Sequence, residues 1–361
     1  MMKSVAVAVA MAVIAPGMGC GTGRGTLAGS AGAAGNGAPI LGTGGAAPPL
    51  TGAAGITGMG CAGIPRRVSL LPPDIVIVLD ASVSMNDAID GSCTGGCVNS
   101  KWSAAARAID VAVTPTTAKV NWGLTALPDF ADACDAGRIA VPAGLFSAAR
   151  INQEITRRTN GEILLNGSNS PLRAAVDVAA AHLSARAAGG HRIVLVITDG
   201  EPDCAPGVSD TFASDAAGTV RAVTGAASLG IATSVIGVAT AGGPAEATLT
   251  AMARAGDATA STYVRAANRD QLTAAMTDLV TGAAGCTLAI PDPPTNDGTT
   301  SRWDINLVAA DQTSRIPLDP SHTNGWDYTD DSRLGAQLYG PACDSLRAGN
   351  SVYVVFVCHE I

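Results

Sequence analysis

The chain has 361 residues, of which 47% are hydrophobic and 14% are charged, and its formal net charge is -8. That length allows two domains with a linker, and the apolar content suffices for a sizeable core. The negative charge argues against nucleic acid as a partner, because its phosphates would repel an acidic surface.

The N-terminal segment has the features of an export signal. Lys3 supplies a positive charge, and residues 4–16 are almost entirely small and apolar. Such a run is too short to span a bilayer but is typical of a signal-peptide core. The sequence Gly17-Met18-Gly19-Cys20 that follows resembles a bacterial lipobox. We therefore assign residues 1–20 to a signal peptide with a lipobox-like end, and Cys20 to the site of lipidation. An ordinary secretory signal is the alternative.

Residues 21–72 are predicted to form a disordered tether. Gly and Ala predominate, with Thr and Pro, and neither a helical nor a strand period is visible. A segment of this kind cannot bury enough surface to offset the entropy of ordering it. We expect it to separate the lipid from the folded part.

Residues 73–285 alternate between strand-like and helix-like segments. Continuous apolar runs at 74–79 and 192–197 are typical of strands buried on both faces. Further strands are predicted at 120–127, 138–141, 232–238 and 262–265, and helices at 101–114, 171–186, 215–229, 245–255 and 269–281. This alternation indicates an α/β domain with a doubly wound, mostly parallel sheet between layers of helices.

From residue 286 the helical period disappears. Strand-like segments at 303–308 and 352–357 are separated by turn-rich stretches. We predict a small β-rich module over residues 286–361, stapled by disulfides.

Both continuous apolar strands of the α/β domain end at an aspartate. The first runs into Asp80, followed by Ser82 and Ser84, and the second ends at Asp199. Ligands collect at the carboxyl ends of strands in open parallel sheets, so these side chains are expected to converge if the strands are neighbours. Ligands with only oxygen donors favour hard cations such as Mg²⁺, Ca²⁺ or Mn²⁺.

The Asp80, Ser82, Ser84 pattern resembles the Asp-x-Ser-x-Ser signature of the metal-ion-dependent adhesion site in von Willebrand factor A domains. Residues 196–200 match that family's central strand, which ends in Asp, here Asp199. The family adds a threonine from a later loop, and Ser170 stands at that place and keeps the hydroxyl. The resemblance covers roughly residues 73–283. It implies a VWA/Rossmann-like fold with these five residues as ligands of Mg²⁺, or of Ca²⁺ or Mn²⁺.

The resemblance implies a binding protein, and no catalytic residue is predicted. Magnesium keeps waters where protein ligands are lacking, so a carboxylate from a protein partner can complete its shell. We expect adhesion or protein recognition by an exported outer-membrane or cell-surface lipoprotein, or alternatively a secreted protein. Contact with the membrane is expected through the lipid anchor only.

Two other functions fit parts of the pattern. A phosphatase-type hydrolase would use Asp80 as nucleophile, but that chemistry needs a second Asp where this chain has Ser82. A structural domain with a non-functional metal site is the other alternative. Ser82 and Ser84 also suit helix caps or turns, and Ser170 suits a helix start. Asp129 and Asp203 are either groups beside or at the rim of the site or, as is usual for carboxylates on exposed loops, simply solvated.

Cysteine usage supports an oxidising compartment. Nine cysteines are present, so eight remain for four disulfides if Cys20 carries a lipid. The candidates are Cys61, Cys93, Cys97, Cys134, Cys204, Cys286, Cys343 and Cys358.

Eight cysteines allow many pairings, and the sequence alone does not settle their connectivity; their positions support three partial expectations. The first two are predicted to close a small loop between Cys93 and Cys97, and to staple loops beside the site through Cys134 and Cys204. In the third, some of the three C-terminal cysteines staple the β-rich module, and one of them remains for Cys61 or another partner.

Overall fold

The computed structural model describes residues 64–128, 134, 137–161, 167–186, 190–283, 286–291, 302–309, 314–329, 333–348 and 350–359. All of them belong to one compact unit, residues 47–361. The predicted signal peptide, the Cys20 anchor, most of the tether, Cys61 and Asp129 lie outside the described residues.

The α/β domain is built on a six-stranded sheet with the order β5-β4-β3-β6-β7-β8. Its strands are β3 (Asp74–Asp80), β4 (Asn121–Leu127), β5 (Val141–Gly144), β6 (Arg192–Thr198), β7 (Ile231–Val238) and β8 (Val264–Ala266). All neighbouring pairs are parallel except β4 with the edge strand β5, which is antiparallel. The predicted doubly wound, mostly parallel sheet is thus confirmed. Of the strand expected at 138–141, only Val141 lies in a strand, because β5 runs from Val141 to Gly144.

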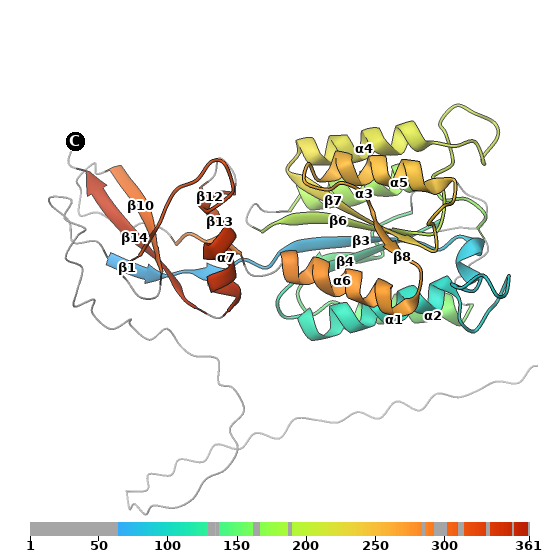
Figure 1. Ribbon diagram of the computed structural model, residues 1–361, viewed down its shortest axis with the longest axis horizontal. Coiled ribbons are helices and arrows are strands. Elements are labelled where there is room, and N and C mark those ends of the chain that lie inside the picture. The colour runs from blue at the N-terminus through green and yellow to red at the C-terminus, as the bar shows by residue number, and fades with distance from the viewer. Residues whose placement is uncertain are drawn as a thin grey trace, which may run out of the picture. The chain divides into compact units, whose positions relative to one another are not determined.

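Helices cover both faces of this sheet (Figure 1). One layer contains α1 (Lys101–Val113), α2 (Ala148–Thr159) and α6 (Arg269–Ala283), and the other contains α3 (Leu172–Ser184), α4 (Ala216–Ser228) and α5 (Ala245–Gly256). Short 3-10 turns, η1 (Val83–Asn86) and η2 (Thr114–Thr116), precede and follow α1. Helix α2 escaped prediction because it is largely polar and buries only Ala148, Ile151, Ile155 and Arg158.

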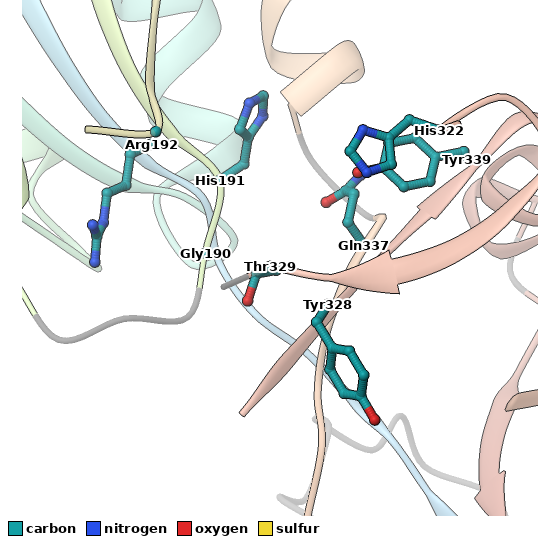
Figure 2. A pocket seen from close by; sticks show the side chains of 9 residues that line it. Gly190, His191, Arg192, His322, Tyr328, Thr329, Gln337 and Tyr339 are labelled. Atoms are coloured by element: carbon teal, nitrogen blue, oxygen red, sulfur yellow. The ribbon is translucent and has the colours of Figure 1, made fainter. Parts of the chain in front are cut away.

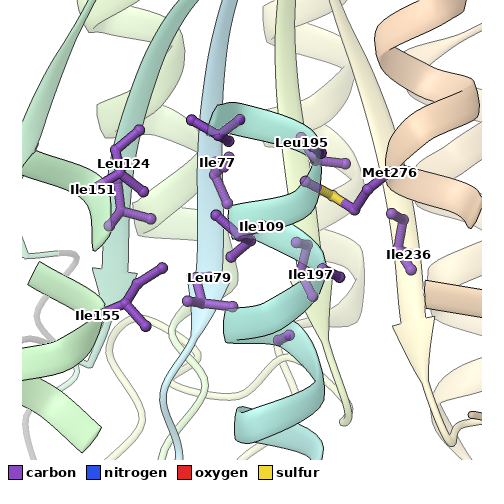
Figure 3. Packing of buried hydrophobic residues seen from close by; sticks show 14 of the residues in the cluster. Ile77, Leu79, Ile109, Leu124, Ile151, Ile155, Leu195, Ile197, Ile236 and Met276 are labelled. Atoms are coloured by element: carbon purple, nitrogen blue, oxygen red, sulfur yellow. The ribbon is translucent and has the colours of Figure 1, made fainter. Parts of the chain in front are cut away.

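The central strand β3 explains the continuous apolar run in the sequence. Its side chains alternate between the two faces: Ile77 and Leu79 pack in the cluster beneath α1 and α6 (Figure 3), while Val76 and Val78 pack against α3. All four are inaccessible to solvent. Burial on both faces therefore requires apolar residues at every position.

The β-rich module contains two four-stranded sheets, β1-β14-β10-β11 and β12-β13-β9-β2, and one helix, α7 (Gly340–Arg347). The strands are β1 (Ile64–Arg67), β2 (Ser69–Leu70), β9 (Thr287–Ala289), β10 (Arg302–Ala309), β11 (Arg315–Ile316), β12 (Gly325–Tyr328), β13 (Gly335–Tyr339) and β14 (Val352–His359). Its core includes Leu307, Trp326, Leu338 and Phe356.

Two of these strands differ from the sequence prediction. Residues 64–67 and 69–70 were assigned to the tether, but they form β1 and β2, which pair antiparallel with β14 and β9. The α/β domain is therefore inserted between two parts of the module. Strands of four and two residues are too short to show a period, and their partners lie more than 200 residues later in the chain.

Three disulfides are present among the described residues: Cys93–Cys97, Cys134–Cys204 and Cys286–Cys343. The first closes the predicted small loop, the second joins the predicted loop pair, and the third lies in the β-rich module. Within the described ranges, no helix is long and apolar enough to cross a membrane.

Candidate metal centre

The candidate site lies at the carboxyl ends of β3 and β6, which are parallel neighbours in the middle of the sheet. Asp80 is the last residue of β3, and η1 begins three residues later, so Ser82 and Ser84 follow in a tight turn. Asp199 comes directly after β6. Hydrogen bonds connect all five predicted ligands. Ser170 bonds to Asp80, and Ser82, Ser84 and Asp199 form a chain. The backbone N–H of Ser82 joins the two groups by donating to Asp80.

Asp80 is fully buried, and both of its oxygens accept hydrogen bonds. Oδ1 accepts from the backbone N–H of Ser82 at 2.9 Å. Oδ2 accepts from Thr198 Oγ1 at 2.6 Å and from Ser170 Oγ at 3.1 Å. Thr198, the last residue of β6, was not predicted as part of the site, although its position beside Asp199 in the sequence was a signal for it.

Asp199 is the second carboxylate, and its side chain is 1% exposed. Oδ1 accepts from Ser84 Oγ at 3.0 Å, and Ser84 Oγ shares a 3.0 Å hydrogen bond with Ser82 Oγ. Oδ2 is 2.7 Å from the ammonium nitrogen Nζ of Lys101, the first residue of α1. Lys101 was also missed, because 98 residues separate it from Asp199 and no local pattern connects the two.

The charges of this cluster are unbalanced. Burial, and after it the nearby negative charge of Asp199, raise the pKa of Asp80 to about 6, although hydrogen bonds from Thr198 and Ser82 oppose the rise. With both carboxylates ionised, the ammonium of Lys101 neutralises one of the two charges. A buried excess of negative charge is costly unless a cation or a proton compensates it.

The loop that carries Ser170 is held by Asp203, for which the sequence left open a role beside the site or a simply solvated carboxylate. Asp203 Oδ1 accepts from the backbone N–H of Ser170 at 2.7 Å, and Oδ2 accepts from Asn169 Nδ2 at 3.3 Å. Burial raises the pKa of Asp203. Cys204, the next residue, is bonded to Cys134. The hydrogen bonds to Asp203 and the neighbouring disulfide thus fix the loop from which the Ser170 hydroxyl donates to Asp80.

The helix-capping alternatives for the serines differ from what the structure shows. Ser82 precedes η1 but its side chain makes no capping hydrogen bond there. Helix α3 has Pro171 at its N-cap position, and the Ser170 hydroxyl donates to Asp80 instead. These hydroxyls are directed into the cluster.

The donor set fits a hard cation. It contains two carboxylates and three serine hydroxyls, all oxygen, as magnesium, calcium and manganese prefer. Across the described parts of the chain, no group of three or more His, Cys, Asp or Glu side chains is placed to hold a metal ion. The candidate site has two such side chains, Asp80 and Asp199, and hydroxyls make up the rest of its donor set.

A separate pocket of about 250 Å³ lies at the opposite edge of the sheet. Gly190, His191 and Arg192 contribute to it at the start of β6, and on its other side His322 stacks on Tyr339 with ring centroids 4.5 Å apart (Figure 2). It contains none of the predicted site residues.

Comparisons with known proteins rest on structure alone, since no family model and no curated protein matches the sequence. The PilB minor pilin from Streptococcus sanguinis is 15% identical over 59% of this chain and 61% of that chain, with a TM-score of 0.46. The pilus adhesin SpaC from Lactobacillus rhamnosus GG is 13% identical over 80% of this chain and 40% of that chain, with a TM-score of 0.43. The manganese-loaded TRAP protein of Plasmodium vivax is 14% identical over 73% and 95%, with a TM-score of 0.39. This chain thus spans less than two thirds of either pilus protein.

Proposed function

We propose that the protein binds a divalent cation at Asp80, Ser82, Ser84, Ser170 and Asp199, and recognises a protein partner through it. The observation that carries the proposal is the convergence of two buried carboxylates with three hydroxyls at the carboxyl edge of a parallel sheet. Asp80, Ser82 and Ser84 form the motif that resembles the metal-ion-dependent adhesion site, Asp199 matches the aspartate at the end of that family's central strand, and Ser170 stands where the family has a threonine.

In this proposal the chain's residues divide the work by charge. Asp80 and Asp199 supply two negative charges, which formally balance those of a divalent ion, while the three serine hydroxyls supply neutral oxygen ligands. When bound, the ion would offer a coordination position, otherwise filled by water, to a carboxylate of the partner. The contacts to Thr198 and Asp203 hold Asp80 and Ser170 in place.

A hydrolytic role for Asp80 has less support. The carboxylate is fully buried and both of its oxygens already accept hydrogen bonds. A nucleophile must reach its substrate, and Ser82 occupies the position where the phosphatase chemistry needs an acid.

The proposed place of action is the cell surface. The N-terminal sequence resembles a lipoprotein signal ending at Cys20, and three disulfides suit an oxidising compartment. Mass spectrometry of the mature protein should find a lipid on an N-terminal Cys20. A mature chain that begins at another residue would contradict the anchor.

Calorimetric titration tests metal binding. Mg²⁺ and Mn²⁺ are titrated into the full mature chain and into Asp80→Ala, Asp199→Ala and a control, Asp177→Ala, which removes an exposed carboxylate on α3. We expect one saturable site in the parent and the control, and none in the other two variants. Circular dichroism must show that all four proteins are folded. A folded parent without binding would refute the proposal, as would unchanged binding in both site variants.

A further inference from the structure

Lys101 brings a positive charge into the candidate metal centre. Its ammonium nitrogen lies 2.7 Å from Asp199 Oδ2, and the lysine side chain is only 15% exposed. The backbone N–H of Lys101 donates to the carbonyl of Asp87, and Ser100 caps α1 by accepting from the N–H of Ser103. The start of the helix is therefore fixed, and the side chain reaches the carboxylate from a defined base.

This ion pair opposes the binding of another cation. Both oxygens of Asp199 are engaged, one by Ser84 and the other by Lys101. An ammonium ion in contact with a ligand carboxylate removes half of the negative charge that would attract a metal. In a partly buried site, like charges a few ångströms apart repel strongly.

The same side chain is able to move away. Lysine has a flexible four-carbon stem and a compact charged group that hydrates well, and its partial exposure shows that solvent reaches it. The ammonium group of Lys101 can therefore move away from Asp199, whereas the backbone and hydroxyl groups around it cannot.

We infer that Lys101 is a built-in competitor of the divalent cation, and that it sets the affinity of the site by pairing with Asp199 when the metal is absent. The inference rests on the proposed metal site. With Lys101 present, the site binds the metal ion more weakly and releases it more readily than the five oxygen-bearing residues would without the lysine. Metal binding exchanges the Lys101–Asp199 pair for a metal–carboxylate pair.

Titration of Mg²⁺ into the full mature chain and three variants tests this inference. Lys101→Met removes the charge and keeps the stem, Lys101→Arg keeps the charge, and Lys119→Met removes an exposed lysine elsewhere. We expect Lys101→Met to bind Mg²⁺ at least tenfold more tightly than the parent, and the other two variants to stay within threefold of it. Lys101→Gln replaces Lys101→Met if the latter does not fold.

The outcomes separate this inference from the proposed function. Equal or weaker binding by a folded Lys101→Met overturns the role of Lys101, and the metal site stands because the parent still binds. Binding by Lys101→Met alone supports the competitor and refutes metal binding by the natural chain. No binding by any of the proteins overturns both.

A second measurement without metal examines the ion pair itself. In EDTA, the unfolding equilibrium constants of the parent, Lys101→Met, Asp199→Asn and the double variant form a thermodynamic cycle. If the two single effects were independent, their product would give the rise in the unfolding equilibrium constant of the double variant. We expect the measured rise to be at least fivefold smaller than this product. A measured rise within twofold of the product would show that Lys101 and Asp199 are not coupled, and would overturn the inference.

Discussion

The hydrogen bond from Thr198 to Asp80 can be removed with little change in shape. Thr198 Oγ1 donates to Asp80 Oδ2 at 2.6 Å, and both residues are fully buried. Thr198→Val replaces the hydroxyl by a methyl group at nearly equal volume, so the main losses are this bond and a longer one, 3.2 Å, from the N–H of Gly200. The metal-free protein shows the effect directly, because no bound ion then competes for Asp80.

The cost depends on the charge of Asp80. A hydrogen bond to a charged group contributes about 1.5–3 kcal/mol, and a neutral one about 0.5–1.5 kcal/mol. Since burial and Asp199 raise the pKa of Asp80 to about 6, the carboxylate is ionised at about pH 8 and mostly neutral at about pH 5. Thr198→Val should therefore lower the free energy of unfolding by roughly 1 kcal/mol more at the higher pH. The same difference corresponds to a rise of about one unit in the pKa of Asp80.

Thr125→Val is the matched control. Thr125 is also fully buried in the sheet, in β4, but its Oγ1 donates to a neutral carbonyl, that of Arg138, at 3.0 Å. Urea unfolding in EDTA at the two pH values gives the free energy for each variant. We expect a pH-dependent cost for Thr198→Val and a constant cost for Thr125→Val. Equal costs at both pH values for Thr198→Val would refute the reasoning about the charge of Asp80.

Two further predictions concern pH and covalent structure. The folded-state pKa of Asp80, about 6, lies above the ordinary value of 3.8 for an aspartate, so the stabilising contribution of its proton is complete below about pH 4 and is lost as the pH rises through 6. Urea unfolding of the metal-free parent in EDTA should lose up to about 3 kcal/mol from this group over that window; a similar loss in Asp80→Asn, which cannot titrate there, would contradict the assignment. Apart from Cys20, the candidate for lipidation, the cysteines outside the three disulfides are Cys61 and Cys358. Strand β1 begins three residues after Cys61, and its Ile64 lies opposite Phe356, two residues before Cys358. Non-reducing peptide mapping of the mature protein should recover a peptide joining Cys61 to Cys358, whereas free thiols at both would contradict this pairing.

Sequence patterns determined the α/β domain because its signals are local. Strands β3 and β6 are buried on both faces, so each appears as an uninterrupted apolar run. An aspartate at the end of each run, with two serines after the first, indicates where the oxygen atoms meet in a parallel sheet. The hydrogen bonds among Asp80, Ser82, Ser84 and Asp199 follow from that rule.

Tertiary structure alone decided three other features. Residues 64–70 form strands only because β14 and β9 supply their hydrogen-bonding partners. Helix α2 was not predicted because it has few apolar residues, and only the folded structure shows that it packs on the sheet. Lys101 has the sequence context of an ordinary residue at a helix start, and nothing near it in the chain indicates Asp199. Pairings across a hundred residues or more depend on how the chain folds back on itself, so a short local pattern does not reveal them. For this protein, the sequence predicted which oxygen-bearing side chains meet at the edge of the sheet, and the folded structure revealed the ammonium group that pairs with one of them.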